Sequence, residues 1–395
     1  MADAGGFSEE GFRAEVRAWL AANFPPVLAH RDPIPYVNDG RIAAADPDFQ
    51  IWRERMVSTG WGAPTWPTEY GGAGLDQSAV PILAEEMVRI GAFNPIRSYA
   101  SMMLAPTLLE FASEEQKARH IPPIARGELR WCQGFSEPGA GSDLAALQTK
   151  CVDAGDHWVV TGQKIWTSGA QHADWCFALV RTDTTRKQGG ISFLLIDMTS
   201  PGIEVRPLVL ISGVSHFCEV FFDEVKVPKE NLVGEVNQGW TIAKRLMQHE
   251  RDSLSTGRGE GVDLSELARC YVGVDAEGRI ADADLRTRLI RNAMRSQAFT
   301  LTGARKTAEA KAGRTSDVVS ALKNLGSEVA QGRAELAVEI LGFNGLGWEG
   351  PGYEAEELEI VRGWLHSRAF SIYGGTHEVQ DNITAKRVLG LGDGR

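Results

Sequence analysis

The chain has 395 residues and a mass of 43.0 kDa, and at roughly 150 residues per domain this length predicts two or three domains. Hydrophobic residues make up 43% and charged residues 24% of the chain, which is typical of a folded globular protein and argues against disorder. The 41 Lys and Arg against 52 Asp and Glu give a net charge of −11, which argues against a nucleic-acid-binding protein.

The first third of the sequence predicts helices, each with one buried face. Apolar residues recur at steps of three and four in 9–22 and again in 78–90. Between them, Trp61 to Gly72 mixes glycine and proline with aromatic residues, which predicts an ordered loop. Ser113, with Glu115 two residues later, marks the start of a further helix. The residues expected to be buried by the two stripes are Phe12, Val16, Trp19, Leu20, Val80, Leu83, Met87 and Ile90.

From about Trp131 the pattern changes to short β-rich runs separated by turn residues. Because no helical pattern lies between these runs, they predict an antiparallel sheet or a small barrel. After Pro228 the helical periodicity returns. The sequence therefore predicts an α+β protein with a helical N-terminal domain (1–130), a middle β-barrel domain (131–235) and a helical C-terminal domain (236–395). The predicted strands are 158–162, 175–180, 191–196, 203–206 and 219–227.

No segment predicts membrane insertion. The longest apolar run, Ile191 to Ile196, is far shorter than the ~20 residues that cross a bilayer, and the N-terminus has no apolar signal segment. Five cysteines without a CxxC pair argue against a disulfide framework and against a metal site. We therefore expect a cytoplasmic protein with reduced thiols. P-loop, GxGxxG, HExxH and GxSxG motifs are also absent, and His377 is expected to face solvent.

Four segments carry a resemblance to a known family. Phe135 to Asp143 (FSEPGAGSD) and Gly162 to Ser168 (GQKIWTS) resemble flavin-proximal motifs of the acyl-CoA dehydrogenase family. Trp66 to Gly72 resembles the family as well, as does Ile372 to Gln380 (IYGGTHEVQ) followed by Ala385 to Gly390. The resemblance implies an N-terminal helical domain, a middle antiparallel β-barrel and a C-terminal four-helix bundle, with FAD at their junction.

The resemblance also assigns the cofactor residues. A flavin needs hydrogen-bond donors along its pyrimidine edge and a surface on which its ring can lie. The family motif assigns that edge to the Phe135 backbone and Ser136, the ring face to Trp166, and the flavin N5 region to Ser168. Without the motif, Trp166 would be interpreted as a core or interface aromatic. The implied FAD-binding residues are Gln133, Phe135, Ser136, Trp166, Thr167, Ser168 and, at the phosphate or adenosine end, Thr376 and Glu378.

Two residues are assigned to the acyl-CoA substrate by the same resemblance. Ser142 corresponds to the family residue that binds the pantetheine arm, although by itself it would be interpreted as a turn hydroxyl. The glycines at 139 and 141 remove side chains from the path of a bulky ligand. Arg251 is the second predicted substrate-binding residue.

The reaction of this family needs a carboxylate base, because the hydrogen on the α-carbon leaves as a proton while the hydrogen on the β-carbon leaves as a hydride. Many members hold the base where this chain has Gly374, whose backbone N–H is instead expected to polarise the thioester carbonyl. Other members place the base on the first C-terminal helix, and Gln248 to Arg251 resembles their site. The resemblance therefore nominates Glu250 as the catalytic base.

The helical pattern supports Glu250 independently. In 238–257 it lies at steps of three and four from Trp240, Ala243, Met247 and Leu254, within an apolar stripe. Burial there is expected to raise its pKa above the ~4.3 of free glutamate. The alternative is a surface glutamate paired with Lys244 or Arg251.

The cofactor phosphates lack an expected cation. Homotetrameric members have an Arg-x-x-Phe-Gly motif, whose place here is taken by 264–271 and by a polar segment, 273–284, that is expected to be exposed. Glu339 stands where the family has Gln, and Arg286 and Arg288 are either a compensation or ordinary surface residues. These departures predict a homo- or hetero-oligomer, in which a related subunit supplies the missing charge.

The sequence favours an FAD-dependent acyl-CoA dehydrogenase that forms a trans-2-enoyl-CoA and passes electrons to an electron-transferring flavoprotein. Two alternatives stay open. One is a flavin oxidase or monooxygenase of the same fold, which uses O2. The other is a non-catalytic partner subunit of a heteromeric acyl-CoA dehydrogenase.

Overall fold

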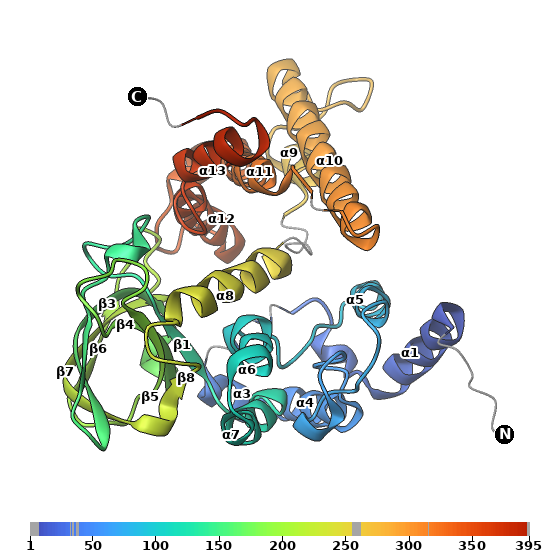
Figure 1. The fold of residues 1–395 in the computed structure, drawn as a ribbon. Coiled ribbons are helices and arrows are strands. Elements are labelled where there is room, and N and C mark those ends of the chain that lie inside the picture. Colours follow the sequence, from blue (N-terminus) through green and yellow to red (C-terminus); the bar gives the residue numbers. More distant parts are fainter. Residues whose placement is uncertain are drawn as a thin grey trace. The chain divides into compact units, whose positions relative to one another are not determined.

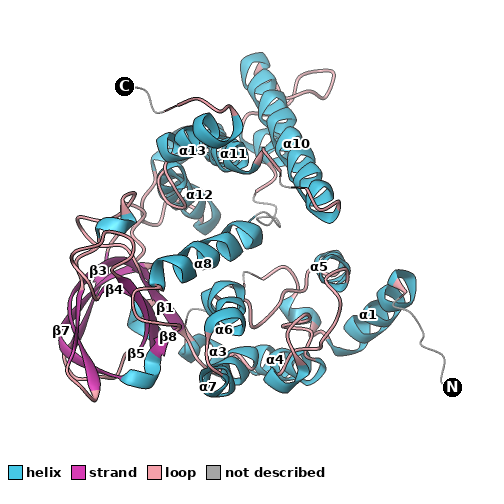
Figure 2. Ribbon diagram, in the orientation of Figure 1, coloured by secondary structure: helices cyan, strands magenta, loops and turns pink. Residues whose placement is uncertain are grey.

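The structure, a computed structural model, describes residues 8–31, 33, 35–36, 39–254, 262–314 and 316–392, and of residues 250–254, 310 and 311 it describes the backbone alone. Two compact units divide the chain. The first unit comprises Met1–Leu208 and His216–Ser253, and the second comprises Val209–Ser215 and Leu254–Arg395. Helices form both terminal regions and strands the middle region (Figures 1 and 2). The α+β prediction is therefore confirmed.

The N-terminal part of the first unit is helical, as predicted. The helix expected at 9–22 spans Glu9–Asn23, and Ser113 caps the helix that begins at Glu114. The loop expected between Trp61 and Gly72 contains only one short 3₁₀ turn, Thr68–Tyr70. The helices are α1 (Glu9–Asn23), α3 (Gly40–Ala45), α4 (Pro47–Thr59), α5 (Ala79–Arg89), α6 (Ala105–Phe111) and α7 (Glu114–Ala125).

The prediction that Val80 belongs to the buried face of α5 is wrong. Val80 is exposed, whereas Ile82 and Glu86 join Leu83 and Met87 on the buried face. Glu86 is buried because three arginines surround its carboxylate at 2.8–2.9 Å. A glutamate is normally expected at the surface, so the sequence did not show that Glu86 lies on the buried face of α5. The arginines are Arg13, Arg17 and Arg89.

Eight strands form one sheet. Seven of them follow the order β6-β7-β3-β2-β4-β5-β8, and β1 pairs with β4 beside this path. Figure 2 shows the sheet curving into a barrel. All five predicted strands are present, and β3 extends six residues beyond the predicted end at 162. Most pairs are antiparallel, but β1 and β2 both run parallel to β4. The β2–β3 hairpin lies between β1 and β4 in the chain and supplies the long crossover that a parallel pair needs. The strands are β1 (Trp131–Gly134), β2 (Lys150–Asp153), β3 (His157–Ser168), β4 (Trp175–Arg181), β5 (Ile191–Asp197), β6 (Ile203–Leu208), β7 (Phe217–Pro228) and β8 (Leu232–Val233).

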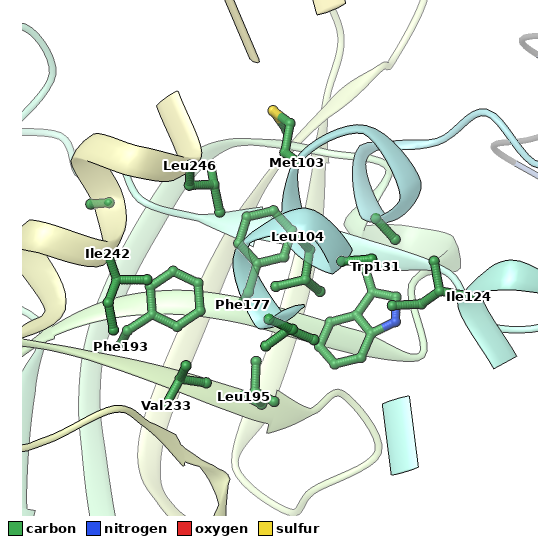
Figure 3. Close-up of a cluster of buried hydrophobic side chains, with 14 of the residues drawn as sticks. Met103, Leu104, Ile124, Trp131, Phe177, Phe193, Leu195, Val233, Ile242 and Leu246 are labelled. Carbon is green, nitrogen blue, oxygen red and sulfur yellow. The ribbon is translucent and has the colours of Figure 1, made fainter. Parts of the chain in front are cut away.

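The main core of the first unit joins the helices to the barrel (Figure 3). Phe177 and Phe193 stack across β4 and β5, with ring centroids 6.2 Å apart. Ile242 and Leu246, on α8 (Gly239–Leu254), belong to the same buried cluster. Their burial anchors the helix that carries position 250 against the barrel.

A buried histidine lies where α7 contacts the start of the barrel. The ring of His120 is 1% exposed and stands edge-on to Trp131 and Trp175, with centroid distances of 5.3 and 4.9 Å. Burial, with a smaller contribution from the charge of Arg119, lowers the pKa of His120 to about 4.

This pKa predicts acid sensitivity of the first unit. Between pH 6.5 and 4 the unfolded chain protonates His120 while the folded chain keeps it neutral, so stability falls as the pH falls. The contribution amounts to about 2 kcal/mol at pH 5. The measurement is the loss of unfolding free energy between pH 7 and pH 5 in wild type and in His120→Leu. The variant should lose about 2 kcal/mol less than wild type, and equal losses would contradict the prediction.

In the part of the second unit that the structure describes, the regular elements are helices, and a Val274–Ile280 bridge holds one short turn. Its segment 273–284 is mostly exposed, with Ile280 buried. Within the described residues, no helix of either unit is long and apolar enough to cross a membrane. The five cysteines are unpaired, as expected. The helices of the second unit are α9 (Leu264–Tyr271), α10 (Ala283–Lys311), α11 (Val319–Ile340), α12 (Ala355–Ser367) and α13 (His377–Ile383).

Candidate active site

An exposed tryptophan sits in a bulge of the barrel. The pairing of β3 with β7 shifts register between Lys164 and Thr167, and Trp166 in this bulge has a φ of +60°. A bulky residue rarely adopts this left-handed conformation, and such strain is concentrated at functional sites. The indole is 55% exposed and touches the edge of Phe217. The bulge thus presents a flat aromatic surface outward.

Thr167, next to this tryptophan, is completely buried, and its Oγ1 has no hydrogen-bond partner among the described residues. Leaving a buried hydroxyl unpaired costs about 1–3 kcal/mol. A polar ligand atom would satisfy it. Ser168 follows and is half-buried.

The segment after β1 lies beside the same strand. The carbonyl of Ser136 accepts a hydrogen bond from the N–H of Ile165 at 2.9 Å, and the Phe135 ring stands edge-on to Phe177 and Phe193. Gln133 is half-buried on β1. The structure therefore brings the predicted flavin-edge residues next to the strand that carries Trp166.

A buried ion pair ties these segments together. Lys164 is fully buried, and its Nζ donates to Glu137 Oε1 at 2.7 Å and to the Phe135 carbonyl at 3.2 Å. Glu137 also accepts the N–H groups of Gln148 and Thr149. Burial by itself raises the pKa of Glu137, but the attraction of Lys164 and these hydrogen bonds outweigh burial and lower it.

The glycine-rich loop leaves open space. A Cβ placed on Gly139 or Gly141 would meet no atom within 4 Å, and Ser142 is exposed. A hollow of about 480 Å³ opens beside Gly139. Neither Ser136 nor Trp166 is among the residues that line it, so it is separate from the aromatic surface. Its lining residues are Glu137, Pro138, Gly139, Ala146, Gln148, Thr149, Gly162 and Gln163.

Glu250 lies on α8, but its side chain, like that of Arg251, is outside the described residues. The predicted burial and pKa of Glu250 therefore stay predictions. The preceding turn of α8 is clamped to α6, because Glu110 accepts from Arg245 at 2.8 Å and lies 3.2 Å from His249 Nε2. The guanidinium of Arg245 lowers the pKa of Glu110.

The other predicted site residues belong to the second unit. Gly374 has a φ of +66°, and a Cβ there would meet open space, so only the backbone conformation favours glycine. Thr376 accepts the N–H of Val379 at 3.3 Å, and Glu378 is exposed. The backbone N–H of Glu378 and the Thr376 hydroxyl lower the pKa of Glu378.

The expectation that His377 faces solvent is wrong. Its ring is partly covered, and Nε2 is buried without a hydrogen-bond partner among the described residues. Polar residues flank His377 in the sequence, which suggested a position facing solvent. In the structure α11 packs against α13, the helix that begins at His377, and covers this side of it.

The charge of Glu339 is balanced within the second unit. Arg288 forms a two-pronged ion pair with it, and both N–O distances are 2.5 Å. The added acid is therefore neutralised by one of the two arginines that were considered as compensating cations. Arg286 donates to the carbonyl of Ile280 instead.

The role of Lys164 was missed from the sequence. A signal was present, because Lys164 shares the even-numbered positions of β3 with Trp158 and Val160, which face the core. A lysine at a core-facing position of a strand needs a buried acidic partner, because an unpaired charge is costly to bury. The sequence could not show that Glu137 is the partner.

Comparison with known proteins identifies the family. Models of the acyl-CoA dehydrogenase N-terminal, middle and C-terminal domains match residues 8–128, 132–225 and 237–389. The chain is 36% identical over 393 residues to acyl-CoA dehydrogenase IpdE1 of Mycobacterium tuberculosis, covering 97% of each chain.

Two solved structures have the same fold. The ChsE4–ChsE5 complex from M. tuberculosis matches with a TM-score of 0.74 and 29% identity, covering 100% of both chains. The Tcur3481–Tcur3483 steroid acyl-CoA dehydrogenase matches with a TM-score of 0.76 and 28% identity, covering 98% of each chain. The chain belongs to the acyl-CoA dehydrogenase family, whose members are flavoprotein oxidoreductases that act in lipid degradation.

Proposed function

We propose that this acyl-CoA dehydrogenase binds FAD and oxidises an acyl-CoA thioester to the trans-2-enoyl-CoA. The observation that carries the proposal is the outward-facing Trp166 in its strained bulge, next to the unpartnered Thr167 hydroxyl. The exposed indole offers a planar cofactor a face on which to stack. FAD, when bound, supplies the acceptor for the hydride from the β-carbon.

In this proposal the residues of the first unit hold the ring. Trp166 covers one face, and the Phe135 backbone and Ser136 donate to the pyrimidine edge, where electron density accumulates on reduction. Ser168 contacts the N5 region, and Thr167 belongs to the same FAD-binding part of β3. Gln133, on β1, is the remaining FAD-binding residue of this unit. Thr376 and Glu378, in the second unit, hold the phosphate or adenosine end.

Glu250 is the proposed base. It removes the proton from the α-carbon as the hydride leaves the β-carbon, so that a C=C bond forms between the two carbons. The Gly374 N–H donates to the thioester carbonyl and stabilises the charge that develops on its oxygen. Ser142 and Arg251 bind the CoA part of the substrate. The clamp of Arg245 and His249 on Glu110 supports this arrangement, because it restrains the turn of α8 before the base.

We propose a substrate with a bulky ring system. One structural relative is described as a steroid acyl-CoA dehydrogenase, and a related ring-bearing thioester is the first class to test here. The unpaired cysteines fit a reducing compartment, so a cytoplasmic location is part of the proposal.

The proposed assembly is an oligomer with a related subunit. Both structural relatives named above are complexes of two different chains. The absent Arg-x-x-Phe-Gly motif and the pairing of Arg288 with Glu339 support a heteromer over a homomer. A partner that supplied the base would make this chain the non-catalytic subunit, and the presence of Glu250 argues against that alternative.

The spectrum of the purified protein tests this function. Alone or with its partner subunit, the protein should show flavin absorbance that bleaches on anaerobic addition of a matched acyl-CoA. Slow reoxidation in air and fast reoxidation by an electron-transferring flavoprotein are expected. Rapid reoxidation by O2 would favour the oxidase alternative. An assembled protein without flavin would refute the assignment of Trp166 and its neighbours.

A further inference from the structure

Several polar contacts join α11 to the last helical segment of the second unit, where α11 packs against α13. Asn324 Nδ2 donates to Asp381 at 2.8 Å, and the hydroxyls of Ser320 and Thr384 are 2.6 Å apart. These contacts hold the two helices together. They also fix the position of Lys323, which lies between Ser320 and Asn324 in sequence on α11.

Two nitrogens in this contact lack acceptors. Lys323 Nζ and His377 Nε2 are both buried and have no hydrogen-bond partner among the described residues. Burying an ammonium group without an acceptor is costly, so such groups are normally paired. Burial lowers the pKa of Lys323, against the opposing attraction of Glu378. A cation held in this state is suited to bind an anion.

Two arginines elsewhere in the second unit are already engaged. Arg288 is paired with Glu339, and Arg368 donates to Glu335 at 2.8 Å. Lys323, by contrast, has no hydrogen-bond partner among the described residues and is attracted by the exposed Glu378. It lies beside the segment Thr376–Glu378 that the proposed function assigns to the phosphate end of FAD.

We propose that Lys323 and His377 form a diphosphate-binding site that takes the diphosphate of FAD. The inference rests on the proposed function, and it adds a cation of this chain to the charge that a related subunit supplies in place of the Arg-x-x-Phe-Gly motif. Phosphate oxygens accept hydrogen bonds from both nitrogens, and the diphosphate charge balances the buried ammonium.

The test compares three variants of the full-length chain. Lys323→Met removes the charge and keeps the length, Lys323→Arg restores a cation, and Lys226→Met removes an exposed lysine from β7 as a control. The measurements are the FAD Kd by titration of flavin-stripped protein and the melting temperature of that protein without FAD.

Lys323→Met should raise the FAD Kd at least 10-fold while leaving the melting temperature of the flavin-free protein unchanged or higher, because the buried unpaired charge is gone. The FAD Kd of Lys323→Arg should stay within about 3-fold of the wild-type value, and the FAD Kd of Lys226→Met should equal the wild-type value. A His377→Leu variant should also raise the FAD Kd. An unchanged FAD Kd in Lys323→Met, or a lowered melting temperature of its flavin-free form, would overturn the site.

CoA carries a diphosphate as well, so the same variants are titrated with CoA. An unchanged CoA Kd is expected, and a CoA Kd that rises in place of the FAD Kd would overturn the FAD assignment. Failure of the proposed function has a different signature. In that case the wild-type assembly binds no FAD, whereas failure of this site leaves wild-type FAD affinity in Lys323→Met.

Discussion

Replacing Glu250 by Gln should lower turnover by about 10²- to 10⁴-fold, the usual effect of removing a general base. The amide keeps the size of the carboxylate but cannot take the α-proton. CoA-ester binding should change little, because the thioester contacts come from other residues. The loss should therefore appear in kcat and in the anaerobic bleaching rate, with a nearly constant KM.

A matched control makes this result specific. Glu54→Gln applies the same chemical change to an exposed glutamate on α4, and it should retain wild-type turnover. His377 is unsuitable as a control, because its Nε2 is buried. Near-normal turnover in Glu250→Gln would show that another carboxylate is the base, and Glu378 would be the next residue to replace.

Replacing Lys164 by Met should destabilise the first unit by about 3–5 kcal/mol, because it leaves the carboxylate of Glu137 buried without its cation. Flavin retention should fall as well, since Lys164 also holds the carbonyl of Phe135 next to the proposed flavin edge. Thermal unfolding and flavin absorbance per chain measure the two effects.

Two further variants separate the charge from the packing. The double change Lys164→Met with Glu137→Gln should recover most of the loss, because no uncompensated charge stays buried. Lys187→Met breaks an exposed pair with Asp143, whose N–O distance is 2.8 Å against 2.7 Å in the buried pair, and should cost at most about 1 kcal/mol. If Lys164→Met lowers the free energy of unfolding no more than Lys187→Met does, the buried pair does not stabilise the first unit.

Local features of the chain could be predicted because they depend on neighbouring residues. The repeat of apolar residues in 9–22 predicted α1 within one residue of its end, and Ser113 was identified as the cap of α7. The β-rich runs predicted the five main strands, since turn residues separate them. Motifs of the family stand in the sequence itself, so the family could be predicted before any fold was known.

Burial and pairing across the chain could be decided only by the tertiary structure. Glu137 and Lys164 are 27 residues apart, and Arg288 and Glu339 are 51 apart, so no local pattern links either pair. The same limit explains Val80 and His377, whose exposure depends on which helix packs against which face. A charge is stable inside a protein only when a partner lies within a few ångströms, and that distance is set by long-range packing. The sequence alone determined the order of the elements and the family motifs, whereas the fold decided which charged and polar groups meet.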